Sequence, residues 1–168
     1  MILGCCGAGK STFAGRLAAT TSLPVIHLDQ EYWLPDWTEP DKKSWHQKVE
    51  RLASRDQWIM DGNYGSSYEI RLRRADAVIY LDYPTWRCLW RVSKRVMKYH
   101  GQVRPDMPEG CKERWDWDFM HYVATYNIVR KKRSMELIKK YENQIDLVIL
   151  NSDREVDNFL DNLKVISI

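Results

Sequence analysis

The stretch that decides the fold is MILGCCGAGKSTFAGRLA, residues 1–18. Its central part, GCCGAGKS (residues 4–11), has the spacing G-x-x-x-x-G-K-[ST] of a phosphate-binding loop. Three apolar residues precede the loop, and Phe13, Leu17 and Ala18 follow it with helical spacing. Strand, glycine-rich loop and helix, in this order, form the context that the motif needs. The alternative is a glycine-rich turn that only starts a helix.

Each residue type in this loop has a chemical reason. Glycines let successive backbone N–H groups point inward as a nest for anions, with no Cβ to keep phosphates away. Lys10 can reach the β- and γ-phosphates as a point charge, and the Ser11 hydroxyl can bind Mg²⁺. We therefore expect ATP to bind to Gly7, Ala8, Gly9, Lys10, Ser11 and Thr12.

Composition limits the classes of protein that fit. The 168 residues carry a formal net charge of +3, which does not by itself indicate a nucleic-acid surface. No apolar run approaches the roughly 20 residues that cross a bilayer, and no signal peptide is recognisable, so we expect no membrane partner. The four cysteines contain no C-x-x-C pair, which argues against a disulfide framework or a zinc cluster. A reducing, cytoplasmic location fits best.

Short apolar segments alternate with helical patterns along the chain. The apolar segments are residues 1–3, 23–28, 57–60, 77–81 and 145–150, and the helical patterns are 10–19, 41–54, 85–99, 119–141 and 155–163. This alternation predicts an α/β fold with helices on both faces of a parallel sheet. We expect one domain over residues 1–168, with a tryptophan-rich excursion at about 31–54 and a polar excursion at about 100–120. Because the first segment is so short, we also expect residues before Met1 in the natural protein.

Three apolar segments end in an aspartate, and ligands of parallel sheets bind at the carboxyl ends of the strands. Asp29 is a candidate general base or acceptor-orienting group, and its alternative role is to cap the next turn. Asp61 is a candidate Mg²⁺ or acceptor contact, and its alternative is an Asp-Gly turn with Gly62. For Asp82, before Tyr83-Pro84, a turn is the favoured interpretation.

Arginines recur at helical spacing in two predicted helices. Arg87, Arg91 and Arg95 lie at i, i+4 and i+8, so they share one helix face. Such a face could hold the charged oxygens of a transferring phosphoryl group. Arg130 and Arg133 repeat the idea on the following helix. The alternative is a solvated basic face.

Other candidates lie where an acceptor would bind. Arg71 follows the loop DGNYGSS (residues 61–67) and could hold an acceptor anion bidentately. Tyr64 of that loop is a candidate acceptor contact. Four aromatic residues follow Asp29 and could stack on a base or sugar: Tyr32, Trp33, Trp37 and Trp45. An equal alternative is a small helical unit that uses tryptophan as its core.

Six stretches, taken in order, resemble the adenylate-kinase-like P-loop kinases over nearly the whole chain. They are GCCGAGKST, HLDQEYWLPDW, WIMDGNY, RLRRADAVIYLDYP, GQVRPDMPEGCKERWDWDF and LVILNSDREV. Within these kinases the chain looks closest to the group called FlaR-related or "DNA topology modulation protein". The first stretch is specific for the superfamily, and the others only as an ordered set.

This resemblance implies a five-stranded parallel sheet and a lid, residues 104–119, that closes over ATP. It implies that Arg95 and Arg133 flank the lid, that Arg71 binds the acceptor and that Asn151 lies in the loop against adenine. It also implies a substrate-orienting role for Asp29. The sequence departs from adenylate kinases at residues 61–65, DGNYG, where they carry Asp-Gly-Phe-Pro-Arg. The resemblance therefore supports ATP as the donor and does not support AMP as the acceptor.

The function that we predict is ATP-dependent phosphoryl transfer to a small molecule, a nucleotide or nucleoside among the candidates. The catalytic candidates are Lys10, Asp29, Arg95 and Arg133, and the Mg²⁺ candidates are Ser11 and Asp61. The acceptor candidates are Asp29, Trp33, Asp61, Tyr64 and Arg71. An alternative is a nucleic-acid-associated ATPase or regulator, since basic residues of two helices could form a patch. A GTP switch lacks its base-reading Asn-Lys-x-Asp.

Overall fold

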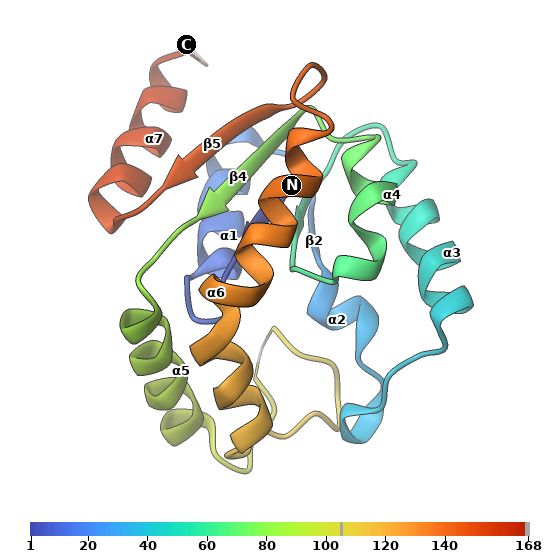
Figure 1. Cartoon of the computed structure of the whole chain (residues 1–168), viewed down its shortest axis with the longest axis vertical. Helices are drawn as coiled ribbons and strands as arrows, with labels where there is room; N and C mark the ends of the chain where they lie inside the picture. Colours follow the sequence, from blue (N-terminus) through green and yellow to red (C-terminus); the bar gives the residue numbers. More distant parts are fainter. Residues whose placement is uncertain (105, 167–168) are drawn as a thin grey trace.

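The chain folds around a five-stranded parallel sheet (Figure 1). The computed structural model describes residues 1–104 and 106–166. The strand order is β2-β3-β1-β4-β5, and every neighbouring pair is parallel. The strands are β1 Ile2–Gly4, β2 Val25–His27, β3 Ile59–Asp61, β4 Ala77–Leu81 and β5 Asp146–Leu150. The predicted α/β class and the parallel five-stranded sheet are confirmed.

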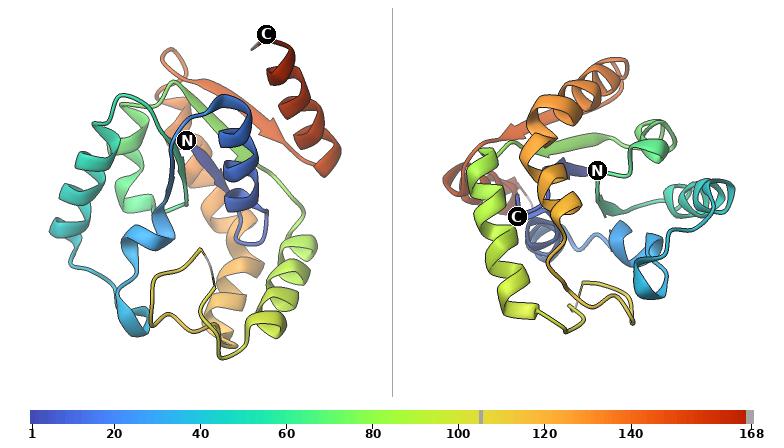
Figure 2. Two further views of the ribbon diagram at one scale, coloured as in Figure 1. Left: turned by 180° about the vertical axis from the view of Figure 1, so that it is seen from behind. Right: turned by 60° about the horizontal axis from the view of Figure 1, so that its bottom comes forward.

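Helices cover both faces of this sheet. The helix α1 and the last helix, α7, lie on one face, and α6 crosses the other (Figures 1 and 2). The α-helices of the described residues are α1 Lys10–Thr21, α2 Leu28–Tyr32, α3 Lys42–Ala53, α4 Tyr68–Leu72, α5 Thr85–Tyr99, α6 Trp117–Lys139 and α7 Asp153–Ile166. Two 3₁₀ turns, η1 Pro35–Trp37 and η2 Gly65–Ser67, complete them. Among these helices, none is long and apolar enough to span a bilayer.

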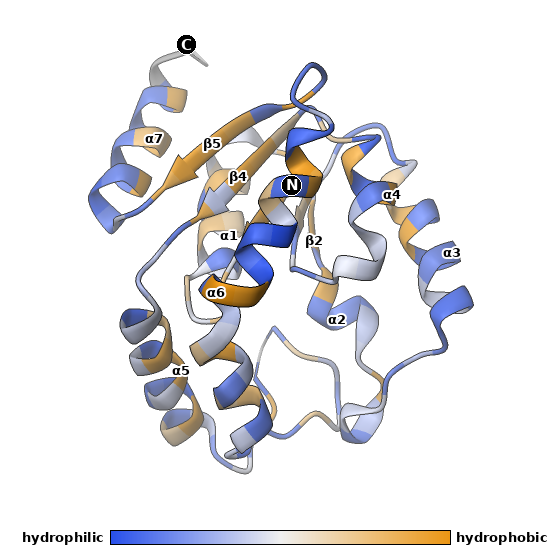
Figure 3. Ribbon diagram, viewed as in Figure 1, coloured by the Kyte–Doolittle hydropathy of each residue, from blue (hydrophilic) through white to orange (hydrophobic). Residues whose placement is uncertain are grey.

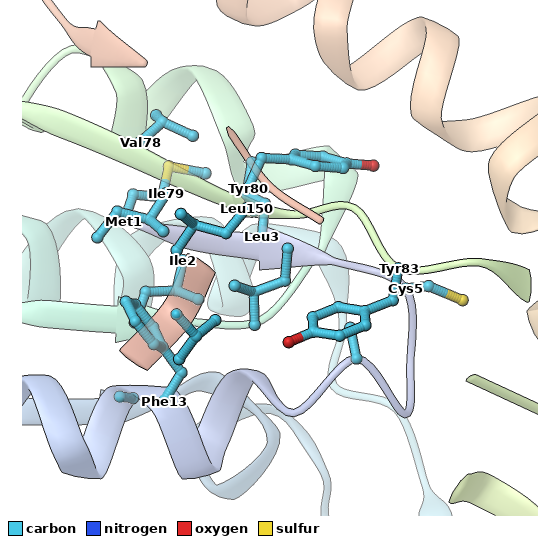
Figure 4. Close-up of a cluster of buried hydrophobic side chains, with 14 of the residues drawn as sticks. Met1, Ile2, Leu3, Cys5, Phe13, Val78, Ile79, Tyr80, Tyr83 and Leu150 are labelled. Atoms are coloured by element: carbon cyan, nitrogen blue, oxygen red, sulfur yellow. The ribbon is translucent and has the colours of Figure 1, made fainter. Parts of the chain in front are cut away.

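The short strand β1 lies at the centre of the sheet. Its side chains Ile2 and Leu3 have no exposed surface, because β3 and β4 flank the strand and helices cover its two faces. Figure 4 shows these side chains packed with Phe13 of α1 and with Ile79 of β4. Figure 3 shows the matching pattern, with hydrophobic residues along β4 and β5 and hydrophilic residues outside on α3 and α7. A central position lets three residues serve as a strand.

The tryptophan-rich excursion forms a second, smaller core. Helix α3 packs Trp45, which is 2% exposed, and Val49 against Ile26 of β2 and Met60 of β3. The Asp41 carboxylate caps this helix by accepting a hydrogen bond from the Ser44 backbone N–H at 3.0 Å. Trp45 is therefore a core residue, as the alternative interpretation of the aromatic residues proposed.

The chain turns into a helix earlier than the sequence indicates. Strand β2 ends at His27, and Leu28 starts the five-residue helix α2, where the sequence predicts strand and then irregular chain. Leu28 is fully buried in the second core, so packing of this side chain starts the helix. Asp29 consequently lies in the first turn of α2.

Arg71 has a structural role, which corrects its assignment as an acceptor-binding residue. The side chain has no exposed surface. Its Nη1 donates to the carbonyl oxygen of Gly62 at 2.8 Å, and its Nη2 donates to those of Asn63 and Tyr64. The guanidinium also lies over the Tyr68 ring, 5.0 Å from its centroid. Burial lowers the pKa of Arg71 to about 10, which leaves the group positively charged at neutral pH. The fork therefore holds the loop after β3.

Replacing Arg71 by lysine should destabilise the protein. A lysine keeps the charge but cannot donate to three carbonyl groups in fixed directions, and hydrogen bonds from charged groups contribute about 1.5–3 kcal/mol each. We expect Arg71→Lys to lower the free energy of unfolding by about 2–4 kcal/mol in urea denaturation. Arg74→Lys, at an exposed position of the same segment, should change it by less than about 0.5 kcal/mol. Equal stability of the two variants would refute the structural role.

Candidate active site

The loop between β1 and α1 has the geometry of an anion nest. Gly7 has φ +85° and Gly9 has φ +94°, both in the left-handed region that favours glycine. A Cβ at Gly7 would lie 2.4 Å from the carbonyl oxygen of Cys88 in α5, so no side chain fits there. Helix α1 begins directly after Gly9, and its unpaired N–H groups and dipole face the loop.

Lys10 closes this loop from inside. Its Nζ donates to the carbonyl oxygens of Gly4 at 3.0 Å and Cys5 at 3.2 Å. Burial acts to lower the pKa of Lys10, but the surrounding acidic groups, Asp29 and Asp61 among them, outweigh it and raise the pKa. The ammonium group is therefore charged and already lies where a phosphate oxygen could replace a carbonyl oxygen as its acceptor.

A cavity of about 460 Å³ lies at this loop, on the edge where the strands end. Its lining combines the loop with residues of α2, β3, α5, the segment after α5 and the start of α7. The predicted site residues that line it are Gly7, Ala8, Gly9, Lys10, Ser11, Thr12, Asp29, Asp61 and Arg95. Those that lie outside the lining are Trp33, Tyr64, Arg71, Arg133 and Asn151.

Ser11 and Asp61 form the pair that fits Mg²⁺. The Ser11 hydroxyl donates to Asp61 Oδ2 at 2.8 Å, and Nδ1 of His27 lies 2.6 Å from Asp61 Oδ1. The hydrogen bond to Asp61 raises the pKa of His27. One carboxylate and one hydroxyl beside a phosphate loop are the protein's usual share of a Mg²⁺ site, which water and substrate phosphates complete. His27 therefore orients the Asp61 carboxylate, a role that its position at the end of a strand does not reveal in the sequence.

Asp29 lines the same cavity as the loop and is held by Tyr64. The Tyr64 hydroxyl donates to Asp29 Oδ1 at 2.6 Å. Burial and the neighbouring Asp29 charge raise the pKa of Tyr64, which keeps the phenol protonated as a donor. One oxygen of the carboxylate is thus fixed by Tyr64, and the residue lines the cavity. Tyr64 itself supports Asp29 from behind, since it does not line the cavity.

Four arginines line the cavity: Arg16 of α1, and Arg91, Arg95 and Arg104. The predicted Arg71 and Arg133 do not line it. Arg91 and Arg95 come from α5, and Arg104 comes from the segment after it. Their partners are carboxylates: Asp153 for Arg91 at 3.0 Å, and Glu113 for both Arg95 at 3.2 Å and Arg104 at 2.6 Å. Arg133 is exposed in the half of α6 that is distant from this segment, which corrects its assignment as a lid-flanking arginine. Helical spacing indicates the face of α6 on which Arg133 lies, but not how far along the helix it lies from the cavity.

The start of α7 contributes Asp153 to the cavity, whereas Asn151 in the loop before α7 does not line it. The Asn151 side chain lies 3.3 Å from Glu155 Oε2, and its backbone N–H donates to the same oxygen at 2.9 Å. Asp153 lines the cavity, pairs with Arg91 and accepts a hydrogen bond from the Tyr83 hydroxyl at 2.6 Å. Contact of this loop with adenine through Asn151 stays a prediction.

Trp33 belongs to a chain of ring contacts outside the cavity. It meets Tyr32 edge-to-face, with centroids 5.0 Å apart, and Trp37 with centroids 5.4 Å apart. Tyr32 in turn contacts Trp45 and Tyr64. The rings pack on one another, so their arrangement favours the core interpretation over stacking on a substrate.

The segment between α5 and α6 reaches across the cavity to the tryptophan-rich excursion. The indole Nε1 of Trp37 donates to the carbonyl oxygen of Lys112 at 2.9 Å, and the Cys111 thiol lies 3.3 Å from that of Leu34. Figures 1 and 2 show the two segments side by side at the open edge of the sheet. The role of this segment as a lid stays a prediction, and the segment is called the lid below. Arg104, Asp106 and Glu113, which it contributes, were missed because irregular chain has no periodicity that would indicate them.

Comparisons with known proteins agree with this fold. No protein-family model matches the chain, and no curated protein matches it. A deoxyadenosine kinase from M. mycoides is 17% identical over 99% of this chain and 98% of its own, with a TM-score of 0.46. The shikimate kinase of Bacteroides thetaiotaomicron is 15% identical over 98% and 95%, with a TM-score of 0.49. A candidate kinase from Chloroflexus aurantiacus is 9% identical over 98% and 96%, with a TM-score of 0.51.

At this level of identity the similarity shows the fold and no substrate. In this chain that fold consists of the five-stranded parallel sheet with the glycine loop between β1 and α1. The chain therefore has the fold of the P-loop kinases.

Proposed function

We propose that this protein is a kinase that transfers the γ-phosphoryl group of ATP to a small-molecule acceptor. The observation that carries the proposal is the lining of one cavity. It combines the phosphate loop, the Ser11–Asp61 pair, the Asp29 carboxylate and arginines that include Arg91, Arg95 and Arg104. A nest for phosphates, a site for Mg²⁺, a base and cations for the developing charge are the parts that phosphoryl transfer uses. A cytoplasmic location, where ATP is available, fits this activity.

The steps of the reaction follow from these positions. Backbone N–H groups of the loop and Lys10 bind the phosphates, and Lys10 exchanges its carbonyl acceptors for phosphate oxygens. Ser11 and Asp61 would hold Mg²⁺, which when bound would neutralise phosphate charge. Asp29 accepts the hydrogen bond of the acceptor hydroxyl and takes its proton while the new P–O bond forms. The bond between the γ-phosphorus and the bridging oxygen breaks, and ADP leaves. Arg95 and Arg104 stabilise the charge on the transferring group.

The narrower resemblance to the FlaR-related group and the nucleic-acid alternative stay predictions. The basic residues that would form a nucleic-acid patch are divided in the structure. Arg95 faces Glu113 in the cavity, Lys131 pairs with Asp82 at 2.5 Å, and Lys94 lies over the Trp90 ring. A phosphate-binding surface needs unpaired cations on one exposed face. We therefore treat this activity as one outcome of the test below.

The proposal predicts acceptor-dependent turnover of MgATP. We expect phosphorus NMR with pooled nucleosides, nucleoside monophosphates and small hydroxy or carboxy metabolites to show a new phosphoryl resonance together with ADP. Lys10→Ala should abolish it, because the variant loses the cation at the β- and γ-phosphates, and chelating Mg²⁺ with EDTA should do the same. Lys98→Ala, at an exposed position of α5, is the matched control and should retain activity. Release of free phosphate alone would shift weight to an ATPase, with nucleic-acid stimulation as the next measurement.

Asp29 generates a second prediction about the same assay. General-base catalysis contributes roughly 10²–10⁴-fold, so Asp29→Asn should lower kcat by about that factor. KM for ATP should change little, because the phosphates bind to the loop. Asp36→Asn, at an exposed position of η1, should leave both constants within about two-fold. A raised KM for ATP with unchanged kcat would show that Asp29 contacts the donor instead.

A further inference from the structure

Glu113 is a buried carboxylate that the lid inserts between two arginines of the cavity. Its side chain is 4% exposed. Oε1 lies 3.2 Å from Arg95 Nη2, and Oε2 lies 2.6 Å from Arg104 Nε. Arg95 belongs to α5 and Arg104 to the lid, so one carboxylate joins the two elements. A carboxylate at this depth would be costly without such partners.

The position of Glu113 depends on closure of the lid. Its backbone N–H donates to the carbonyl oxygen of Gln102, and its carbonyl oxygen accepts from the Gly101 N–H, both at 2.8 Å. These bonds make a short ladder within the lid. The preceding residue, Lys112, accepts the hydrogen bond from Trp37 across the cavity. Glu113 therefore reaches Arg95 when this strand of the lid lies against the tryptophan-rich excursion.

Both arginines keep donors for a substrate while Glu113 holds them. A guanidinium has five N–H donors in a planar fork. Glu113 contacts Nη2 of Arg95 and Nε of Arg104, and Asp106 accepts from Nη1 of Arg104 at 2.9 Å. The remaining N–H groups can bind phosphate oxygens, because both side chains line the cavity. A γ-phosphoryl group can thus bind without displacing Glu113.

We propose that Glu113 is a positioning residue that couples closure of the lid to the orientation of Arg95 and Arg104 toward the γ-phosphoryl group of ATP. The inference rests on the proposed function, since it needs ATP in this cavity. Without the carboxylate, two guanidinium groups of like charge would lie close together in a poorly solvated site and would turn away from each other. Glu113 keeps them together and directs their free edges into the cavity.

The test separates binding of the γ-phosphoryl group from binding of the rest of the nucleotide. Calorimetry would give the Kd values of MgADP and of the non-hydrolysable ATP analogue MgAMP-PNP for wild type, Glu113→Gln and Glu109→Gln. Glutamine keeps the shape of Glu113 and removes its charge. We expect Glu113→Gln to weaken MgAMP-PNP by at least ten-fold and MgADP by less than two-fold. Glu109, an exposed glutamate of the same lid, is the matched control and should change neither.

Each other result contradicts the inference in a recognisable way. An equal loss for both nucleotides would show that Glu113 only stabilises the fold. A gain in affinity for MgAMP-PNP would show that Glu113 competes with the phosphate for the arginines. If the wild-type protein binds neither nucleotide, the proposed function itself fails. This result does not depend on any variant.

A shorter carboxylate keeps the test decisive if Glu113→Gln does not fold. Glu113→Asp preserves the charge balance of the lid but withdraws the carboxylate by one methylene, so it cannot reach both guanidinium groups in the same geometry. We expect a folded protein with a selective loss for MgAMP-PNP of at least three-fold. Wild-type Kd values for both nucleotides in this variant would overturn the positioning role.

Discussion

The shape of the phosphate loop depends on backbone atoms of two other elements that press against its glycines. A Cβ at Gly4 would lie 2.4 Å from the carbonyl oxygen of Leu81 in β4, and one at Gly7 the same distance from that of Cys88 in α5. Real Cβ atoms do not approach backbone so closely, so the loop must run without side chains at both places. The sequence motif permits the nest, and the contact of β1 with β4 and α5 determines its path. The shape of the loop is thus a property of the assembled sheet.

Charges in the cavity have partners before a nucleotide binds. Lys10 donates to loop carbonyls, Ser11 and His27 hold Asp61, Asp153 holds Arg91, and Glu113 holds Arg95 and Arg104. An unpaired buried charge would cost several kcal/mol, so these pairs stabilise the charged side chains of the cavity. They also fix the directions of the donors in advance, which is the preorganisation that electrostatic catalysis needs. On the proposed function, a phosphate oxygen would replace or join the present hydrogen-bond partners of these side chains, which would not need to be reoriented.

The sequence predicted correctly those features that depend on short-range patterns of residues. Helix α5 has the predicted bounds, and the strand-end acids Asp29 and Asp61 share the cavity with the loop. The sequence pattern did not predict the features that depend on how the elements are arranged in three dimensions. The spacing of arginines on α6 does not indicate how far each of them lies from the lid. The sequence around Arg71 does not indicate whether its guanidinium binds backbone carbonyl groups or an anion. Glu113 lies in an irregular segment, and only the three-dimensional approach of Arg95 and Arg104 gives it a role.

Residues that do not touch the substrate side nevertheless determine where Asp29 lies. Tyr64 has φ +38°, an unfavourable conformation for a non-glycine residue that the surroundings must enforce. Arg71 enforces this conformation by donating to the carbonyl oxygens of Asn63 and Tyr64. Trp45 also packs against the Tyr64 ring, with centroids 5.2 Å apart. The ring so placed delivers its hydroxyl to Asp29 at 2.6 Å. The aromatic core and the buried arginine therefore fix the orientation of Asp29 indirectly, because together they determine the position of Tyr64.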